Sequence, residues 1–178
     1  MKYFDELKRT MEWLAAKPDT LFVGQTAGVP GTFMFQTLRD IPKDRALEFP
    51  VNESFQMQFS LGLALEGYVP VSVYPRQNFL LLATGDMSNM IDKLSAMSGG
   101  AVNPKIIIRV ATGPFKPVHP GHQHIGNFAE GFRKILDWIE VVEVNEPEEI
   151  FPAYQNAYER KDGRSTLIIE DGNFYNEK

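Results

Sequence analysis

Short apolar runs rich in β-branched residues alternate with helical patterns along the whole chain. The clearest run is Lys-Ile-Ile-Ile-Arg-Val at 105–110. Similar runs lie at 20–25, 45–49, 69–74, 139–144 and 166–170. Continuous runs of this length are typical of strands buried on both faces, and parallel neighbours need a crossover that is usually helical. The alternation therefore predicts a three-layer α/β fold: a mostly parallel sheet with helices on both faces.

Helical spacing fills the intervals between these runs. The expected helices span 3–16, 53–67, 78–97, 124–136 and 146–160. Asn52 can cap the second helix. This helix is apolar on most faces, so we expect it in the centre of the fold; its large apolar residues are Phe55, Phe59, Leu61, Leu63 and Leu65. Ligands of such sheets bind at the carboxyl ends of strands, so the junctions to inspect are 25–33, 50–54, 75–79 and 111–124.

Composition bounds the class of protein. The 178 residues suit one domain, and 43% hydrophobic with 23% charged residues excludes disorder as the main state. The net charge is −5, so the chain lacks the basic surface that is typical of a nucleic-acid binder. There is no cysteine, no apolar run approaches the ~20 residues of a membrane span, and the start of the sequence is highly charged. We therefore expect a cytoplasmic protein without contact to membranes.

All three histidines, His119, His122 and His124, fall within six residues of the loop after the best strand. Imidazole binds several transition metals, but Pro120 and Gly121 interrupt the segment and no ligand geometry follows from it. Two other interpretations stand beside a metal site: a histidine that contacts substrate or transfers protons, and a polar loop that enters a helix. A helix beginning at His124 would favour the neutral imidazole.

Glu53 follows a predicted strand and opens the apolar helix. The simple interpretation is a surface carboxylate stabilised by the helix dipole. Its setting, Phe49-Pro-Val-Asn-Glu53-Ser-Phe55, places apolar residues on both sides of the turn. A carboxylate partly buried there could exchange protons near neutral pH.

The junction Tyr74-Pro-Arg-Gln-Asn-Phe79 offers aromatic and cationic side chains. Tyr74 and Phe79 either stack on a flat ring or belong to the core. Arg76 and Arg109 either bind an anionic substrate or form salt bridges at the surface. Walker, Gly-x-Gly-x-x-Gly and Gly-x-Ser-x-Gly motifs do not occur.

Taken in order, the junction motifs resemble a known family over residues 20–173. The motifs are Leu21-Phe-Val-Gly-Gln25, Phe49-Pro-Val-Asn-Glu53-Ser, Ala64-Leu-Glu-Gly67-Tyr-Val-Pro70, Tyr74 to Phe79, Met97-Ser-Gly-Gly100, Ile108-Arg109, Gln123-His124 and Leu167-Ile-Ile-Glu-Asp171. They are similar to the pyrimidine-binding domain of thiamine-diphosphate enzymes of the transketolase and 2-oxo acid dehydrogenase type. The likeness is strongest to the β subunit of the decarboxylating component of pyruvate dehydrogenase.

The resemblance implies roles for single residues. The family glutamate at the place of Glu53 bonds the 1′ nitrogen of the aminopyrimidine and so promotes deprotonation of the thiazolium carbon. Tyr74, Gln77 and Phe79 would line the pyrimidine pocket, although the family often has an aromatic residue where this chain has Gln77. His124 would transfer protons at the substrate. Apart from the resemblance, His119, His122 and Arg76 are further candidates for contact with the substrate, from their residue type and their place at the junctions.

The resemblance also implies partners. The family's Gly-Asp-Gly…Asn motif for magnesium and diphosphate does not occur, and Gln25 and Thr26 stand where the dehydrogenase β subunit has two glutamates. We therefore expect residues 1–178 to be a single pyrimidine-binding domain without the diphosphate-binding and C-terminal domains. A separate α-like subunit would hold most of the diphosphate and Mg²⁺, in an α2β2-type heterotetramer active only when assembled. The expected reaction is 2-oxo acid decarboxylation with acyl transfer, or ketol transfer. The alternative is a regulatory or assembly subunit that keeps the fold without the chemistry.

Overall fold

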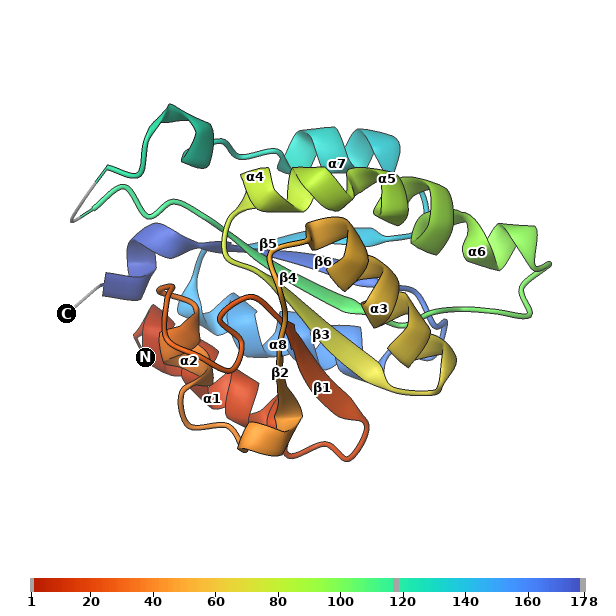
Figure 1. Cartoon of the computed structure of the whole chain (residues 1–178), viewed down its shortest axis with the longest axis horizontal. Helices are drawn as coiled ribbons and strands as arrows, with labels where there is room; N and C mark the ends of the chain where they lie inside the picture. The colour runs from red at the N-terminus through yellow and green to blue at the C-terminus, as the bar shows by residue number, and fades with distance from the viewer. Residues whose placement is uncertain (1, 117–118, 177–178) are drawn as a thin grey trace.

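The computed structural model describes residues 2–116 and 119–176 (Figure 1). Within these residues, six strands form one sheet in the order β2-β1-β3-β4-β6-β5, and every neighbouring pair is parallel. The strands are β1 (Thr20–Gly24), β2 (Ala46–Glu48), β3 (Val69–Tyr74), β4 (Ile107–Thr112), β5 (Glu140–Val144) and β6 (Thr166–Asp171). The predicted α/β fold with a parallel sheet is confirmed, and each strand overlaps the run that predicted it.

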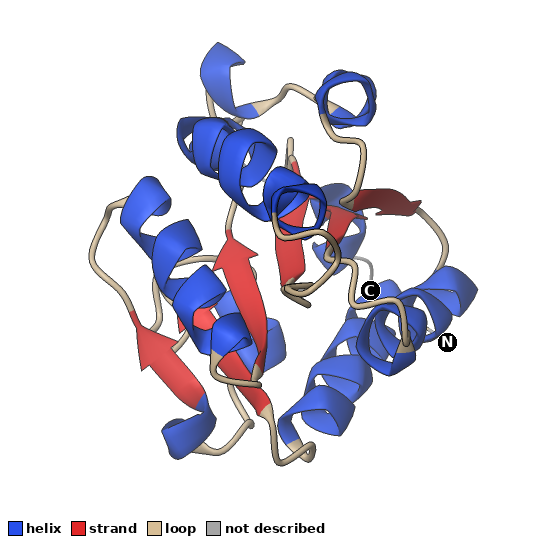
Figure 2. Cartoon of the chain, turned by 90° about the vertical axis from the view of Figure 1, so that its right-hand side faces the viewer, coloured by secondary structure: helices blue, strands red, loops and turns tan. Residues whose placement is uncertain are grey.

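Helices cover both faces of the sheet (Figures 1 and 2). One face carries α1 (Tyr3–Ala15), α2 (Phe35–Leu38) and α8 (Pro147–Glu159). The other carries α3 (Glu53–Leu65), the helical run 77–97 and α7 (Ala129–Ile135). The run 77–97 comprises α4 (Gln77–Leu80), η2 (Leu81–Ala83), α5 (Thr84–Asp86), the π-helical turn η3 (Met87–Ile91) and α6 (Asp92–Met97).

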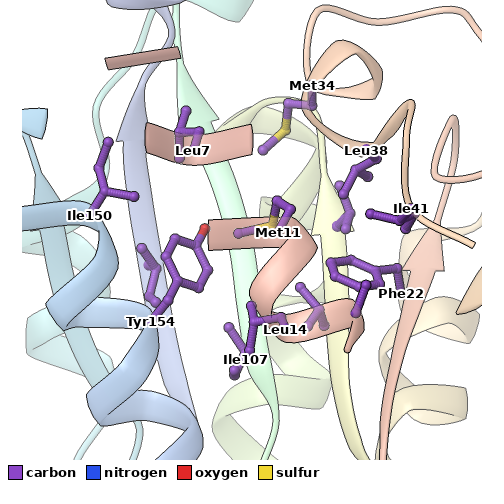
Figure 3. Packing of buried hydrophobic residues seen from close by; sticks show 14 of the residues in the cluster. Leu7, Met11, Leu14, Phe22, Met34, Leu38, Ile41, Ile107, Ile150 and Tyr154 are labelled. Atoms are coloured by element: carbon purple, nitrogen blue, oxygen red, sulfur yellow. The ribbon is translucent and has the colours of Figure 1, made fainter. Parts of the chain in front are cut away.

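Strand alternation divides the core into two clusters. In β4, Ile107 and Ala111 pack with α1 and α8, whereas Ile108 and Val110 pack under the other helices. Figure 3 shows the first cluster, in which side chains of α1, α8 and β1 meet above Ile107. Both faces of the central strands are thus buried, which explains their continuous apolar sequences.

The predicted central position of α3 is wrong. Its buried side mixes apolar Met57 and Leu61 with polar residues. Gln56 Nε2 donates to the Val73 carbonyl at 3.0 Å and to Ser72 Oγ at 3.2 Å, and Ser60 Oγ lies 3.0 Å from Ser72 Oγ. Phe55 is 49% exposed, and its ring contacts Phe49 on the outer side. The aromatic residues suggested burial because periodicity does not show which face turns inward.

The predicted helix 124–136 begins five residues late. His122–His124 form a 3₁₀ turn, η4, and α7 starts only at Ala129. Asn127 Oδ1 accepts the Ala129 N–H at 3.0 Å, and the Phe128 ring packs so close to Gly126 that a side chain there would clash. His124 is therefore not at the N-terminus of an α-helix, and the dipole argument for its neutral form does not apply.

Arg109 is neither a surface arginine nor a substrate ligand. Its side chain is fully buried on the α1/α8 face and pairs with Glu170 of β6. Further bonds reach Thr37 of α2 and Tyr175 of η5 (Gly172–Asn176). The arginine thus ties four elements together inside the protein.

The strand order determines where a ligand can bind. From β1 the chain passes to β2 on one side, and then returns past β1 to β3 on the other. Such a switch point leaves a crevice outside the carboxyl ends of β1 and β3. In the described part of the chain, no helix combines the length and the apolar character needed to cross a membrane.

Candidate functional site

A cleft of about 590 Å³ opens at the switch point. Its walls come from the loop after β1, from α2, from the junction after β3 and from α4: Gly31, Thr32, Phe33, Gln36, Pro75, Arg76 and Phe79. Because all strands are parallel, the junctions predicted from the sequence lie at this same edge of the sheet. The cleft therefore brings two predicted site residues, Arg76 and Phe79, together with a wall from the first loop.

Glu53 is 6% exposed at the first turn of α3 and does not belong to the wall of this cleft. Asn52 caps the helix by accepting the Phe55 N–H at 2.9 Å. Gln25 Nε2 donates to Glu53 Oε1 at 3.3 Å, and among the described residues no donor reaches Oε2. One oxygen of a buried carboxylate is thus free to accept a hydrogen bond from a bound group.

Tyr74 lies beneath Glu53. It is 1% exposed, and its hydroxyl donates to the Glu53 main-chain carbonyl at 3.1 Å. Burial raises the pKa of this phenol well above its ordinary value, with the Glu53 charge as a further cause. The ring has no open face for stacking in this structure, so its visible contribution is to support the start of α3.

His124 and Phe79 are neighbours, with ring centroids 5.5 Å apart. His124 Nδ1 lies 2.9 Å from Asn78 Oδ1, and Nε2 lies 3.1 Å from Gln123 Nε2. An amide oxygen at Nδ1 and an amide nitrogen at Nε2 fit the neutral tautomer that carries its proton on Nδ1. The lone pair on Nε2 is then the basic position of this histidine.

Arg76 lines the cleft without an acidic partner. Its Nη1 donates to the Gly113 carbonyl at 2.7 Å, and the guanidinium lies 5.5 Å from the Phe33 ring centroid. No carboxylate among the described residues lies within ion-pair distance of it. Withdrawal from water lowers the pKa of Arg76, although the group stays charged. An anionic ligand in the cleft would provide the missing partner.

The remaining predicted residues lie apart from the cleft. Gln77 is 1% exposed; its Oε1 accepts the Phe128 N–H and its Nε2 donates to Asn127 Oδ1. His119 and His122 are exposed, with ring centroids 5.8 Å apart. No group of three histidine or acidic side chains within 2–116 and 119–176 is arranged to hold a metal ion.

Several residues at the site were not singled out from the sequence. Thr32, Phe33 and Gln36 wall the cleft, and Asn78 orients His124. Thr32 and Phe33 could have been found from the sequence, because they lie in or next to a Gly/Pro-rich loop that follows a strand at the ligand-binding edge of the sheet. Asn78 sat in a predicted junction, but its pairing with a residue 46 positions later leaves no trace in the sequence.

Comparison with solved structures supports the fold described above. No protein-family model and no curated protein matches the chain. The chain is similar to a solved structure described as "Split gene transketolase, inactive beta4 tetramer", with a TM-score of 0.72 and 12% identity over 96% of this chain and 51% of that one. It therefore spans about half the length of that chain. At this identity the likeness is one of fold: the chain has a transketolase-like α/β fold.

Proposed function

We propose that this chain is the pyrimidine-binding, β-like subunit of a two-component thiamine-diphosphate enzyme. The assembled enzyme would cleave or form a carbon–carbon bond next to a carbonyl, by 2-oxo acid decarboxylation with acyl transfer or by ketol transfer. The observation that carries this proposal is Glu53: a buried carboxylate with one free oxygen, at the switch point of a transketolase-like sheet.

The side chains present fit the pyrimidine half of that cofactor. A pyrimidine ring needs an acceptor for a ring N–H and an aromatic surface, and Glu53 Oε2 and the Phe79 ring are of these types. Thiamine diphosphate, when bound, supplies a carbanion equivalent that adds to carbonyl groups. Glu53 would share a proton between Oε2 and the 1′ ring nitrogen, and Gln25 would hold the other oxygen.

His124 and Arg76 are proposed to act on the substrate. When a substrate hydroxyl displaces the Gln123 amide, Nε2 of His124 can take its proton or, once protonated, donate a hydrogen bond to a developing oxyanion. Arg76 would bind a substrate carboxylate or phosphate in the cleft, where its charge has no internal partner. His119 and His122, on the exposed loop, would contribute to substrate affinity. Gln77 and Tyr74 would hold α7 and α3 in place around the pocket.

A partner subunit is part of the proposal. Apolar side chains remain exposed just before α3, on α3 itself and on the run 77–97: Val51, Phe55, Leu81, Leu82, Met90 and Met97. Phe55, Phe59 and Leu63 also line a groove of about 510 Å³ along α3. Exposed apolar surface of this kind marks a protein interface. An α-like subunit carrying Gly-Asp-Gly…Asn would cover it and hold the diphosphate with Mg²⁺.

Calorimetry on the pure chain tests the proposal. With thiamine diphosphate and Mg²⁺ we expect no binding in the micromolar range, because the described residues hold no metal-binding group and the sequence has no Gly-Asp-Gly…Asn motif for the diphosphate. Addition of the α-like subunit should produce tight binding and deuterium exchange at the reacting carbon of the cofactor. Micromolar binding by the chain alone would contradict the proposal that the cofactor site is shared with a partner subunit. An assembled complex that binds the cofactor but never exchanges would indicate a regulatory subunit instead.

A further inference from the structure

The loop after β1 contains a strained residue beside the candidate site. Thr26 has φ +55° and is the one non-glycine residue with positive φ in the described segments. A β-branched side chain strongly disfavours this left-handed conformation. Such strain persists only where the surroundings enforce it, and it gathers at functional sites. The contacts around Thr26 show what enforces it.

Glu48, at the end of β2, binds the main-chain amides of the turn at Thr26. Its Oε1 accepts the Thr26 N–H at 2.8 Å, and its Oε2 accepts the N–H groups of Gly28 at 2.9 Å and Val29 at 3.2 Å. One carboxylate thus satisfies three main-chain donors. No lysine or arginine among the described residues forms an ion pair with Glu48. The charge therefore acts on the loop amides, through charge-assisted hydrogen bonds.

The loop also closes on itself around Thr26. Thr26 Oγ1 lies 2.7 Å from Thr32 Oγ1. A Cβ at Gly31 would stand 2.6 Å from Thr26 Cγ2, so only glycine fits there without a shift. The held turn thus sets the path of Gly31 and Thr32, which wall the cleft. The turn also fixes the position of the preceding residue, Gln25, whose side-chain amide donates to Glu53.

We propose that Glu48 is a positioning residue that holds the left-handed turn at Thr26, and thereby places Gln25 against Glu53 and shapes the cleft wall. Glu48 itself contacts neither substrate nor cofactor. The catalytic consequence rests on the function proposed above, whereas the geometric content can be tested on the full chain without partner, cofactor or turnover.

The test follows the side-chain amide of Gln25 by nitrogen-15 NMR. In the wild type this signal should move as Glu53 is protonated, since the two groups are hydrogen-bonded; Glu53→Gln identifies that response by abolishing it. In Glu48→Gln we expect the response to disappear, and the amides of Thr26, Gly28 and Val29 to exchange at least ~10-fold faster. Glu66→Gln, which removes an exposed charge from the same chain, should leave both readouts unchanged.

A rescue variant separates strain from general stability. Thr26→Gly removes the cost of positive φ, because glycine adopts this conformation freely. In Thr26→Gly/Glu48→Gln the Gln25 response should return to that of Thr26→Gly alone, although the amides still exchange fast. Unchanged readouts in Glu48→Gln would overturn the proposal, and so would failure of the double variant to recover the response. If Glu48→Gln does not fold, the double variant alone decides, because the proposal requires it to fold and keep the response.

Discussion

Arg109 and Glu170, on the adjacent strands β4 and β6, form an ion pair with both side chains fully buried. Two parallel bonds join them, Nε to Oε1 at 2.8 Å and Nη2 to Oε2 at 3.0 Å. The phenols of Tyr154 and Tyr175 also donate to the Glu170 carboxylate. The attraction of Glu170 keeps the pKa of Arg109 well above its ordinary value despite complete burial. Removing either partner would leave an uncompensated charge in the core.

Arg109→Met should therefore destabilise the protein by about 3–5 kcal/mol, the usual cost of breaking a buried pair from one side. Arg133→Met is the matched control, because Arg133 pairs with Glu143 and Glu130 at the surface. That control should cost no more than about 1 kcal/mol. Urea unfolding of the two variants makes the comparison. A similar small loss in both would show that the buried pair contributes little.

Five of the six tyrosines should titrate above the ordinary pH range. Burial raises the pKa of all five, and the bond to Asp19 helps to raise that of Tyr158 to about 12. Because the folded pKa lies above the ordinary value of 10.0, Tyr158 contributes stability below pH 10 that is lost as the pH rises towards about 12. Ultraviolet absorbance of tyrosinate measures the ionisation. Tyr158→Phe should remove the step at about 12, and ionisation of most tyrosines near pH 10 without unfolding would contradict the burial.

Glu53→Gln should leave folding and assembly intact but lower turnover of the assembled enzyme by ~10²–10⁴-fold. The amide oxygen can still accept the Gln25 bond, whereas the side chain can no longer share a proton with the cofactor. Deuterium exchange at the reacting carbon of the cofactor is the measurement, and the thermal midpoint of the variant is the check on folding. Exchange at the wild-type rate would remove Glu53 from the mechanism.

His124→Ala should spare cofactor deprotonation and lower full turnover at least ~10-fold, because His124 is proposed to act on the substrate. The two steps are measured separately in the assembled enzyme. His122→Ala is the control from the same loop; its exposed ring should matter less. Wild-type turnover in His124→Ala would leave His124 with the structural role of packing against Phe79.

Much of the fold was predictable because it depends on local pattern. The run 69–74 coincides with β3, and the helix 146–160 with α8 apart from one residue at each end. The start of α7 at Ala129 lies five residues after the predicted start, and Gly126 and Asn127 are ordinary signals of that boundary. The burial of Gln56 in α3 could not be predicted from the sequence, since its side-chain amide is satisfied by Ser72 and by main-chain carbonyls of β1 and β3.

The candidate site likewise contains residues that the sequence pattern could place and residues that it could not. The parallel pattern sufficed to place Glu53, Arg76 and Phe79 at one edge of the sheet. The pairing of Glu48 with the amides of the first loop, and the burial of Arg109, depend on contacts between distant segments. Arginine and glutamate are surface residues on average, so composition alone points to the wrong side of the protein.

The position of β6 between β4 and β5 has a consequence for synthesis on the ribosome. Strand β5 emerges before β6 yet has no neighbour in the sheet until β6 arrives, and until then the outer edge of β4 stays open. Arg109 likewise waits for Glu170, which lies 61 residues further along the chain. Closure of this half of the sheet and neutralisation of its buried cation are therefore a single late event. A nascent chain stalled before Thr166 would expose an unpaired strand edge and an unmatched arginine together, the features that invite aggregation and chaperone binding.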